Sequence, residues 1–531
     1  MGQIESLIFL LGVAALLAQL ARVAKVPYPI FLVLGGLGLG FVPMLPAVEI
    51  PPEVIFVIFL PPLLNSAAFS SSPLDLRAHL RAITLLAVGL VFATTFAVAA
   101  VAHLLVGLSW PVAFVLGAIL SPTDPVAAEA IFRRLGVPER VGTVVGGESL
   151  INDGTGLVAF RVAVGVATGA TAFSFAEAGL NFLLVGGGGI VVGLVLALVI
   201  LPLWARLKDA SIQITFSVLI PYGVYILAEE VLHVSGILAV VTYGLTQGWR
   251  APRLFADAST RIQATAFWSV LVFVLEAMLF VLLGQQLPSI LGNLGEYTVA
   301  QVLFYAALVY LAVLGARSAF FFTVPYLHPL FDRLFRSRYL RATWREYLVM
   351  SWSGMRGAVS LAAALTVPLT TVGGEPLAGR DLILFITFAV ILATLVLQGL
   401  TLGPLIGALR LRGTDNDAET LAELETRLEG ARAALGRLEE MWEASVIPPS
   451  AQERMREYYE ERIRSYRAGI EAGGTTEEYA DSSAAWRDWR RELLAAERDA
   501  IVGLRDRGEI SPEVMRRIIR DLDLEESRIG G

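Results

Sequence analysis

The stretch PVAFVLGAILSPTDPVAAEAIF, at residues 111–132, is apolar except for a short polar interruption near its middle. Segments of roughly 17–25 mainly apolar residues cross a bilayer as helices, so this stretch predicts a membrane span. Pro122 and Pro125 flank Asp124 at the interruption. Proline removes a backbone donor and breaks the helical ladder. We therefore predict a helix that is broken beside a carboxylate and leaves free carbonyls and helix ends inside the protein.

Similar apolar stretches recur along the chain of 531 residues, of which 56% are hydrophobic and 17% charged. This apolar excess is too large for an ordinary soluble protein. It predicts an all-α polytopic membrane protein with about thirteen transmembrane helices. The predicted spans are residues 4–21, 28–45, 53–71, 80–107, 111–132, 140–168, 175–205, 211–231, 234–249, 262–290, 298–326, 343–368 and 381–409.

The basic residues between these spans fall in alternate loops, with Arg380 as the exception. Cytoplasmic loops carry the excess of Lys and Arg, so these loops are predicted to be cytoplasmic, with the N-terminus outside. The segment Met1–Leu7 lacks the basic region of a signal peptide, which predicts that the first span is kept. The basic residues on the predicted cytoplasmic side are Arg22, Lys25, Arg77, Arg81, Arg133, Arg134, Arg140, Arg206, Lys208, Arg250, Arg253, Arg333, Arg336, Arg338 and Arg341.

The end of the chain differs in composition, since residues 411–531 hold 19 Arg and 28 Asp or Glu. We predict a transmembrane domain over residues 1–410 and a cytoplasmic helical domain over 411–531. Its expected helices cover 421–440, 451–470 and 484–503, with a further helix start at 511–513. The tail is either a solvating appendage or a regulatory or dimerising module. The chain has no cysteine and no basic block, which excludes disulfides, thiolate chemistry and a nucleic-acid partner.

Ionisable residues inside a span are costly and normally face a partner or a cavity, so they are the candidate functional residues. Asp153 lies near the middle of the span 140–168. Ser149 precedes it by four residues and shares its helical face, and Glu148 and Asn152 share an adjacent face. Carboxylate, hydroxyl and amide oxygens together predict a cage for a small hard cation. The alternative is an acid satisfied by hydrogen bonds between helices.

A third charged segment, SWSGMRGAVS at residues 351–360, places Arg356 near the middle of its span. Arg356 stays protonated and needs an acidic or carbonyl partner. We predict a structural ion pair between Glu148 and Arg356, which leaves Asp124 and Asp153 as titratable anions. Gly354 and Gly357 beside Arg356 allow close backbone approach. Among weaker candidates, Arg161 is expected to pair with an acid, Arg317 is interpreted as snorkelling along its helix, and Glu276 also lies in a span.

Two buried carboxylates with neutral oxygen donors suit exchange better than catalysis. Burial favours the protonated carboxyl and a bound cation favours the ionised one, so a site that holds either species couples their transport. Metal-dependent hydrolysis would need ligands such as a His-x-x-x-His pair, which the sequence lacks. Serine proteolysis would need a histidine at depth, whereas the four histidines fall near span ends. We therefore predict a secondary transporter, with no enzymatic activity and no cofactor.

The strings SPTDPVA, GESLINDGTGLVAF and SWSGMRGAVSLAAAL resemble, in order and spacing, signature segments of the monovalent cation:proton antiporter family, in its sodium/proton exchanger branch. The resemblance implies an inverted-repeat fold, with a homodimer-forming interface domain beside a mobile core domain and elevator-like alternating access. It implies Asp153 as the principal ion- and proton-binding residue, with Asp124, Thr123 and Ser149 as co-ligands. Asn152 resembles the electroneutral branch. The implied function is exchange of Na⁺ or Li⁺ for H⁺ across the bacterial plasma membrane, for pH and sodium homeostasis.

The sequence also leaves alternatives. K⁺/H⁺ exchange would use the same motifs, and a passive channel or a non-transporting ion or pH sensor could be built on the same scaffold. Ser66 stands where many relatives have a carboxylate, so affinity or pH dependence is expected to differ at that position.

Overall fold

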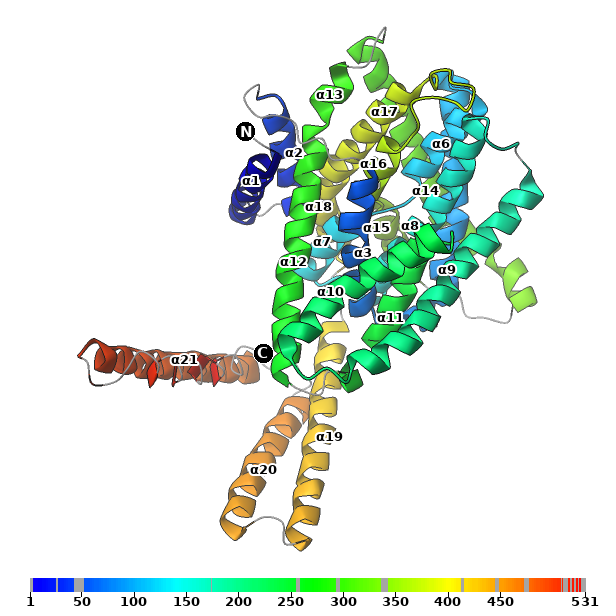
Figure 1. Ribbon diagram of the computed structural model, residues 1–531. Helices are drawn as coiled ribbons and strands as arrows, with labels where there is room; N and C mark the ends of the chain where they lie inside the picture. The colour runs from blue at the N-terminus through cyan, green and yellow to red at the C-terminus, as the bar shows by residue number, and fades with distance from the viewer. Residues whose placement is uncertain are drawn as a thin grey trace. The chain divides into compact units, whose positions relative to one another are not determined.

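The computed structural model divides the chain into two compact units, Met1–Arg412 and Gly413–Gly531, with helices as the named elements of both described parts (Figure 1). The predicted helix start at 511–513, and Lys25, Arg336, Arg338 and Arg341, lie outside the described residues. The structure describes residues 3–24, 27–42, 52–172, 174–254, 258–292, 297–335, 342–411, 415–444, 448–471, 477–507 and 509, and the pairs 514–515, 518–519, 522–523 and 525–526.

Several helices of the first unit are long and apolar enough to cross a membrane. Seven such helices lie in the described part of the chain: Leu74–Val106, Glu139–Ala167, Ala176–Trp204, Ala210–Val231, Ser259–Gly292, Val299–Thr323 and Arg380–Leu409. Four shorter apolar helices accompany them: Ile8–Ala24, Tyr28–Gly40, Phe56–Ser70 and Trp110–Leu120. This is the all-helical, polytopic architecture that the composition predicts. The count of thirteen spans stays a prediction, because shorter and broken helices make up the remainder.

The elements of the first unit follow the predicted spans closely. They are α1 (Gln3–Ala24), α2 (Tyr28–Gly40), α3 (Pro52–Ser70), α4 (Pro73–Thr84) with η1 (Leu85–Leu90), α5 (Val91–Val101) and η2 (Ala102–Val106), α6 (Trp110–Leu120), α7 (Val126–Leu135), α8 (Glu139–Ala167), α9 (Phe175–Trp204), α10 (Ala210–Ile226) with η3 (Leu227–Val231), α11 (Gly236–Leu254), α12 (Ala258–Gln285), α13 (Leu287–Gly292), α14 (Val299–Phe335), α15 (Trp344–Trp352), α16 (Ala358–Leu365), and α17 (Arg380–Ala393) with η4 (Thr394–Gln398) and α18 (Gly399–Leu409).

Two of the predicted spans are interrupted helices. The span 111–132 becomes α6 and α7, separated by residues 121–125, which confirms the break predicted from Pro122 and Pro125. The span 343–368 becomes α15 and α16, separated by residues 353–357. The sequence did not predict this second break, because Gly354 and Gly357 permit an irregular backbone without enforcing it as proline does. The backbone N–H of Asp124 donates to the carbonyl of Met355 at 2.8 Å, so the two breaks are in direct contact.

Glycines bring several helix backbones into contact, which is how membrane helices pack closely. A Cβ at Gly36 of α2 would overlap a backbone carbonyl of α12. Equivalent contacts join Gly193 of α9 to α11, and Gly248 of α11 to α3. Gly117 of α6 likewise meets a backbone carbonyl of α5. These helices therefore pack at backbone distance and hold their neighbours in fixed positions.

A polar contact fixes the ends of α8 and α15 relative to each other. Thr343 and Glu346 form a capping box at the start of α15, satisfying two backbone N–H groups there. Glu346 is buried and also pairs with Arg140 in the first turn of α8, with 2.6 Å between Nη2 and Oε1. The helix that carries Glu148 is thus joined to the helix that precedes the second break, where Arg356 lies.

The second unit contains α19 (Asp415–Glu443), α20 (Pro449–Glu471) and α21 (Glu477–Asp506), which cover the predicted tail helices. A small apolar cluster joins α19 and α20 through Leu428, Ala431 and Ile463. Arg462 of α20 stacks over Tyr458, Tyr459 and Tyr466. The acidic tail therefore has apolar and cation–π contacts of its own rather than serving only as solvated charge.

Candidate ion-binding site

The break between α6 and α7 presents both helix ends to charged groups. The guanidinium of Arg356 donates through Nη1 to the carbonyls of Ser121 and Pro122, each at 2.7 Å. These carbonyls follow the end of α6, where the helix dipole is negative and a cation is favourable. At the start of α7, Oδ1 of Asp124 accepts a hydrogen bond from the backbone N–H of Val126 at 3.0 Å. The carbonyls at the end of α6 are thus bonded by the Arg356 cation, and a backbone N–H at the start of α7 is bonded by the Asp124 carboxylate.

Asp124 also lies against the start of α16. A Cβ built on Gly357, which precedes α16, would overlap the Asp124 carboxylate. The N-termini of α7 and α16 therefore both face this carboxylate, and each contributes a partial positive charge that stabilises it. This geometry explains why glycine is required at position 357.

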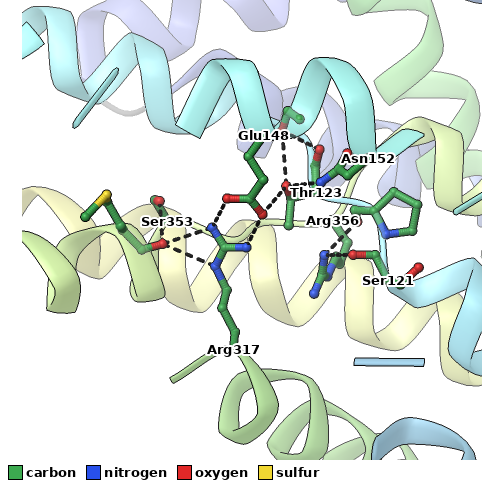
Figure 2. A network of polar contacts seen from close by, with 10 residues as sticks. Ser121, Thr123, Glu148, Asn152, Arg317, Ser353 and Arg356 are labelled. Carbon is green, nitrogen blue, oxygen red and sulfur yellow. Dashed lines mark hydrogen bonds and ion pairs between the residues drawn. The ribbon is translucent and has the colours of Figure 1, made fainter. Parts of the chain in front are cut away.

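The predicted oxygen cage forms a hydrogen-bond network around Thr123 (Figure 2). The side-chain amide of Asn152 donates to Oγ1 of Thr123 at 2.8 Å, and the hydroxyl of Ser149 donates to the Thr123 carbonyl at 2.6 Å. Thr123 Oγ1 lies 3.1 Å from Ser149 Oγ and 3.3 Å from Oε1 of Glu148. The network locks α8 against the break after α6. Oδ1 of Asn152 is buried and has no hydrogen-bond partner within the described residues, which leaves one acceptor available.

The ion pair at Glu148 differs from the one predicted. Glu148 pairs with Arg317 of α14, with 2.5 Å between Nη1 and Oε1 and 2.9 Å between Nη2 and Oε2 (Figure 2). Arg317 also donates to the Met350 carbonyl, from Nε at 3.2 Å and from Nη2 at 3.0 Å. The predicted Glu148–Arg356 pair is wrong, because the Arg356 guanidinium donates instead to the carbonyls that follow the end of α6. The interpretation of Arg317 as snorkelling is also wrong, since its side chain is only 2% exposed.

Asp153 lies one turn beyond Ser149 on α8 and is 9% exposed. Within the described part of the chain no ion pair joins Asp124 or Asp153 to a basic side chain, and no hydrogen bond reaches the Asp153 carboxylate. The structure thus places all five predicted ion-site residues around the first break. Two of them, Asp124 and Asp153, have carboxylates with no basic partner among the residues that the structure describes.

Two other predicted candidates have partners. Arg161 of α8 pairs with Glu229 of η3, which confirms that it pairs with an acid, but the Arg161 side chain is 42% exposed, so the pair lies at the edge of the bundle and not inside it. Glu276 of α12 accepts a hydrogen bond from the hydroxyl of Tyr28. Ser66 is half-buried, whereas its neighbour Asn65 is buried and donates to Gln247 at 3.4 Å.

The model of the family described as "sodium/hydrogen exchanger, transmembrane" matches residues 9–408, which cover the whole first unit except its ends. The chain belongs to the sodium/hydrogen exchanger family. Membership places it among the multi-pass membrane proteins that exchange cations for protons.

Two similar proteins are named as Na⁺/H⁺ antiporters. The exchanger is 34% identical to the Na⁺/H⁺ antiporter ApNhaP of Aphanothece halophytica, over 85% of this chain and 82% of that one. It is 31% identical to the low-affinity Na⁺/H⁺ antiporter NhaS1 of Synechocystis, over 87% and 84% of the two chains. The solved structure of the sodium proton antiporter MjNhaP1 from Methanocaldococcus jannaschii has the same fold. Its TM-score is 0.62 at 24% identity, and the match covers 77% of this chain and 99% of that one.

Proposed function

We propose that the exchanger transports one Na⁺ or Li⁺ against one H⁺ without net charge movement. The observation that carries this proposal is the distribution of charge at the two breaks. Glu148 is neutralised by Arg317, while Asp124 and Asp153 have no basic partner among the described residues. The site therefore keeps carboxylates that can take either a cation or a proton.

The charge balance favours electroneutral exchange. In this proposal Asp153 is the one group that exchanges Na⁺ for H⁺, and Asp124 keeps the same charge in both states. Asp153 with Na⁺ and Asp153 with H⁺ have the same net charge, and the carrier then crosses equally charged in both directions. Asn152 supports this scheme, because an acid at that position would add a second titratable charge.

Asp153 is the principal ligand in this proposal, and Asp124 is the second carboxylate. Thr123, Ser149 and Asn152 supply neutral oxygens, of which Oδ1 of Asn152 is the acceptor without a partner in the described residues. Hard monovalent cations prefer such oxygen donors. Glu148, Arg317 and Arg356 hold the breaks in position and do not touch the ion.

Alternating access is proposed to move a core around α6–α8 and α14–α18 against a scaffold of α2, α3, α9, α11 and α12. The glycine contacts that fasten α2 to α12, and α9 and α3 to α11, support a rigid scaffold. The alternating loop charges support an N-terminus outside and a tail in the cytoplasm of the bacterial plasma membrane. The family resemblance supports a homodimer and a role in pH and sodium homeostasis.

K⁺/H⁺ exchange is the second candidate. A relative from Bacillus pumilus that is 34% identical is named a sodium, potassium, lithium and rubidium/H⁺ antiporter. This name shows that a related sequence accepts larger cations, so cation preference has to be measured for this chain.

The test is proton movement in liposomes that contain the purified exchanger, driven by Na⁺, Li⁺ or K⁺ gradients. Electroneutral exchange predicts proton efflux that is unchanged when the membrane potential is clamped. Asp153→Asn is expected to abolish exchange, whereas Arg206→Gln, on an exposed residue far from the site in sequence, serves as the matched control. Exchange at the normal rate by Asp153→Asn would refute the assignment, and a clamp-dependent rate would refute the stoichiometry.

A further inference from the structure

A buried threonine outside the ion site forms hydrogen bonds beside the second break. Thr394 is the first residue of η4, a π-helical turn within the span Arg380–Leu409. Its hydroxyl donates to the Ile391 carbonyl at 2.9 Å and accepts from the backbone N–H of Arg356 at 3.0 Å. Single π-helical turns inside α-helices frequently occur at functional sites. The Thr394 hydroxyl thus connects this turn to the backbone that interrupts α15 and α16.

The backbone N–H of Arg356 needs this acceptor because no helix supplies one. α15 ends at Trp352 and α16 begins at Ala358, so Arg356 lies in the irregular backbone between them. The residue is only 1% exposed, and a buried N–H without a partner costs as much free energy as a lost hydrogen bond. Threonine provides the lone pair, whereas valine has nearly the same shape and provides none. The contact therefore depends on the hydroxyl and not on the shape of the side chain.

The same backbone segment also contacts the first break. The Met355 carbonyl accepts from the N–H of Asp124 at 2.8 Å, and the Arg356 guanidinium donates to the carbonyls that follow α6. Gly357 lies directly against the Asp124 carboxylate. These three residues are thus held by Thr394 of η4 and by the break that carries Asp124. A shift of their backbone away from η4 would move each of their contacts with the first break.

The turn η4 is itself held by a helix of the proposed scaffold. Gly399 follows η4 at the start of α18, and a Cβ on it would overlap the side chain of Ile30 in α2. The same Cβ would lie 3.8 Å from the sulfur of Met355. Both α2 and the second break therefore pack against the junction of η4 and α18. This packing fixes the position from which the Thr394 hydroxyl bonds Arg356.

We propose that Thr394 is a positioning residue of the ion site. Its hydroxyl holds the backbone of Arg356, the segment around Arg356 holds Asp124, and the position of Asp124 sets how tightly the site binds Na⁺. No hydrogen bond joins Thr394 to Asp124 or Asp153 in the described part of the chain, so its effect passes through Arg356. The proposal rests on the proposed function, because it names a residue that controls the affinity of that same site.

Initial rates of Na⁺-driven proton movement in liposomes, measured over a range of Na⁺ concentrations, test this role. Thr394→Val removes the acceptor, and the apparent KM for Na⁺ is expected to rise by roughly threefold to tenfold, the effect of one lost hydrogen bond. The maximal rate should stay near that of the wild type, since binding alone is weakened. Thr394→Ser keeps the hydroxyl and should keep the wild-type KM. A role in folding alone would instead lower the maximal rate at an unchanged KM.

Thr387, two helical turns before Thr394, provides a matched control. It is also fully buried, and its hydroxyl has no hydrogen-bond partner within the described residues. Thr387→Val makes the same chemical change in the same span and should leave the KM unchanged. Thr394→Cys keeps the test decisive if Thr394→Val does not fold, because a thiol is a weaker acceptor than a hydroxyl. Its KM should lie above that of Thr394→Ser.

Hydrogen–deuterium exchange of the purified full-length exchanger tests the contact without transport. Thr394→Val should speed the exchange of the backbone amide of Arg356 and of the amide of Asp124, which bonds Met355. Thr387→Val should leave both amides as protected as in the wild type. If the wild type moved no protons in response to Na⁺, the proposed function would fail, while this measurement would still decide whether Thr394 positions Asp124.

Three results would overturn the proposal. One is a KM for Na⁺ that stays at the wild-type value in Thr394→Val and Thr394→Cys, whether or not the maximal rate falls. Another is an equal rise of the KM in the Thr387→Val control, which would indicate a general effect of changing a buried threonine in this span. The third is unchanged exchange of the Asp124 amide in Thr394→Val, which would show that the two breaks keep their contact without this hydroxyl.

Discussion

The carboxylate of Asp124 lies so close to the backbone of Gly357 that a methyl group on this glycine would overlap it. The two residues come from different interrupted helices, which are also joined by the hydrogen bond from Asp124 to Met355. The position of the carboxylate is therefore set by the absence of a side chain at position 357.

Gly357→Ala is expected to displace Asp124 and to lower the exchange rate by roughly tenfold to a hundredfold, since misplacing a reacting group by about 1 Å has effects of that size. Exchange in liposomes measures this loss. Gly142→Ala, where an added Cβ has open space, is the control and should exchange normally. If Gly357→Ala exchanged at the wild-type rate, the contact would have no functional role.

The pairing of Glu148 with Arg317 predicts a specific pattern of stability. Glu148→Gln leaves a buried guanidinium without its anion and should lower the free energy of unfolding by about 3–5 kcal/mol. Removing both partners in Glu148→Gln/Arg317→Met should recover part of that loss. Thermal melting in detergent reports the order of the variants. If Arg356→Met, and not Arg317→Met, recovered the stability lost in Glu148→Gln, the pair seen in the structure would not be the one that stabilises the protein.

Competition between Na⁺ and H⁺ at Asp153 predicts the direction of the pH dependence. Binding of a cation to a carboxylate releases its proton, so lowering the pH should raise the apparent KM for Na⁺, by up to about tenfold per pH unit. The maximal rate should change much less. Initial rates over a matrix of pH and Na⁺ concentrations separate the two quantities. A KM that does not vary with pH would show that the two ions use different groups.

The ion pair between Arg161 and Glu229 joins α8 of the proposed core to η3 beside the scaffold. If these parts move against each other, bridging them should stop exchange. Because the chain contains no cysteine, Arg161→Cys/Glu229→Cys can be bridged with a short bismaleimide without side reactions at other thiols. We expect the bridged protein to bind Na⁺ but not exchange it. Either single-cysteine variant with the same reagent is the control, and full exchange by the bridged protein would contradict movement at this contact.

Much of the fold follows from local sequence, because a membrane span is determined by its own composition. The apolar stretches predicted the helices, and Pro122 and Pro125 predicted the first break, since proline acts on its own backbone. The second break depends on Gly354 and Gly357, and glycine allows many conformations. Only the contacts with Arg317 and Asp124, which leave no room for a Cβ, show why glycine is needed there.

The residues of the candidate ion site were predicted as a set, but the partner of Glu148 was predicted wrongly. Residues 148–153 share a helix, so their spacing places them together. The partner of Glu148 depends instead on which distant helix faces α8. Arg317 and Arg356 are both intramembrane arginines, and the sequence offered no means to choose between them. The signal that could have favoured Arg317 is its position near the middle of the apolar stretch 298–326, where snorkelling to the surface is least favourable.

The bond between Arg356 and the carbonyl of Ser121 joins residues 235 positions apart. At a synthesis rate of about 5–20 residues per second, Arg356 is synthesised roughly 10–50 s after Ser121, so the carbonyls at the end of α6 lack this hydrogen-bond donor for that time. During that time the nascent chain holds an interrupted helix with unmet backbone carbonyls in the membrane. The chain is therefore most exposed to chaperones and quality-control proteases before α15 and α16 have been inserted. A truncated message that ends before Arg356 would yield a protein whose carbonyls after α6 lack their hydrogen-bond donor.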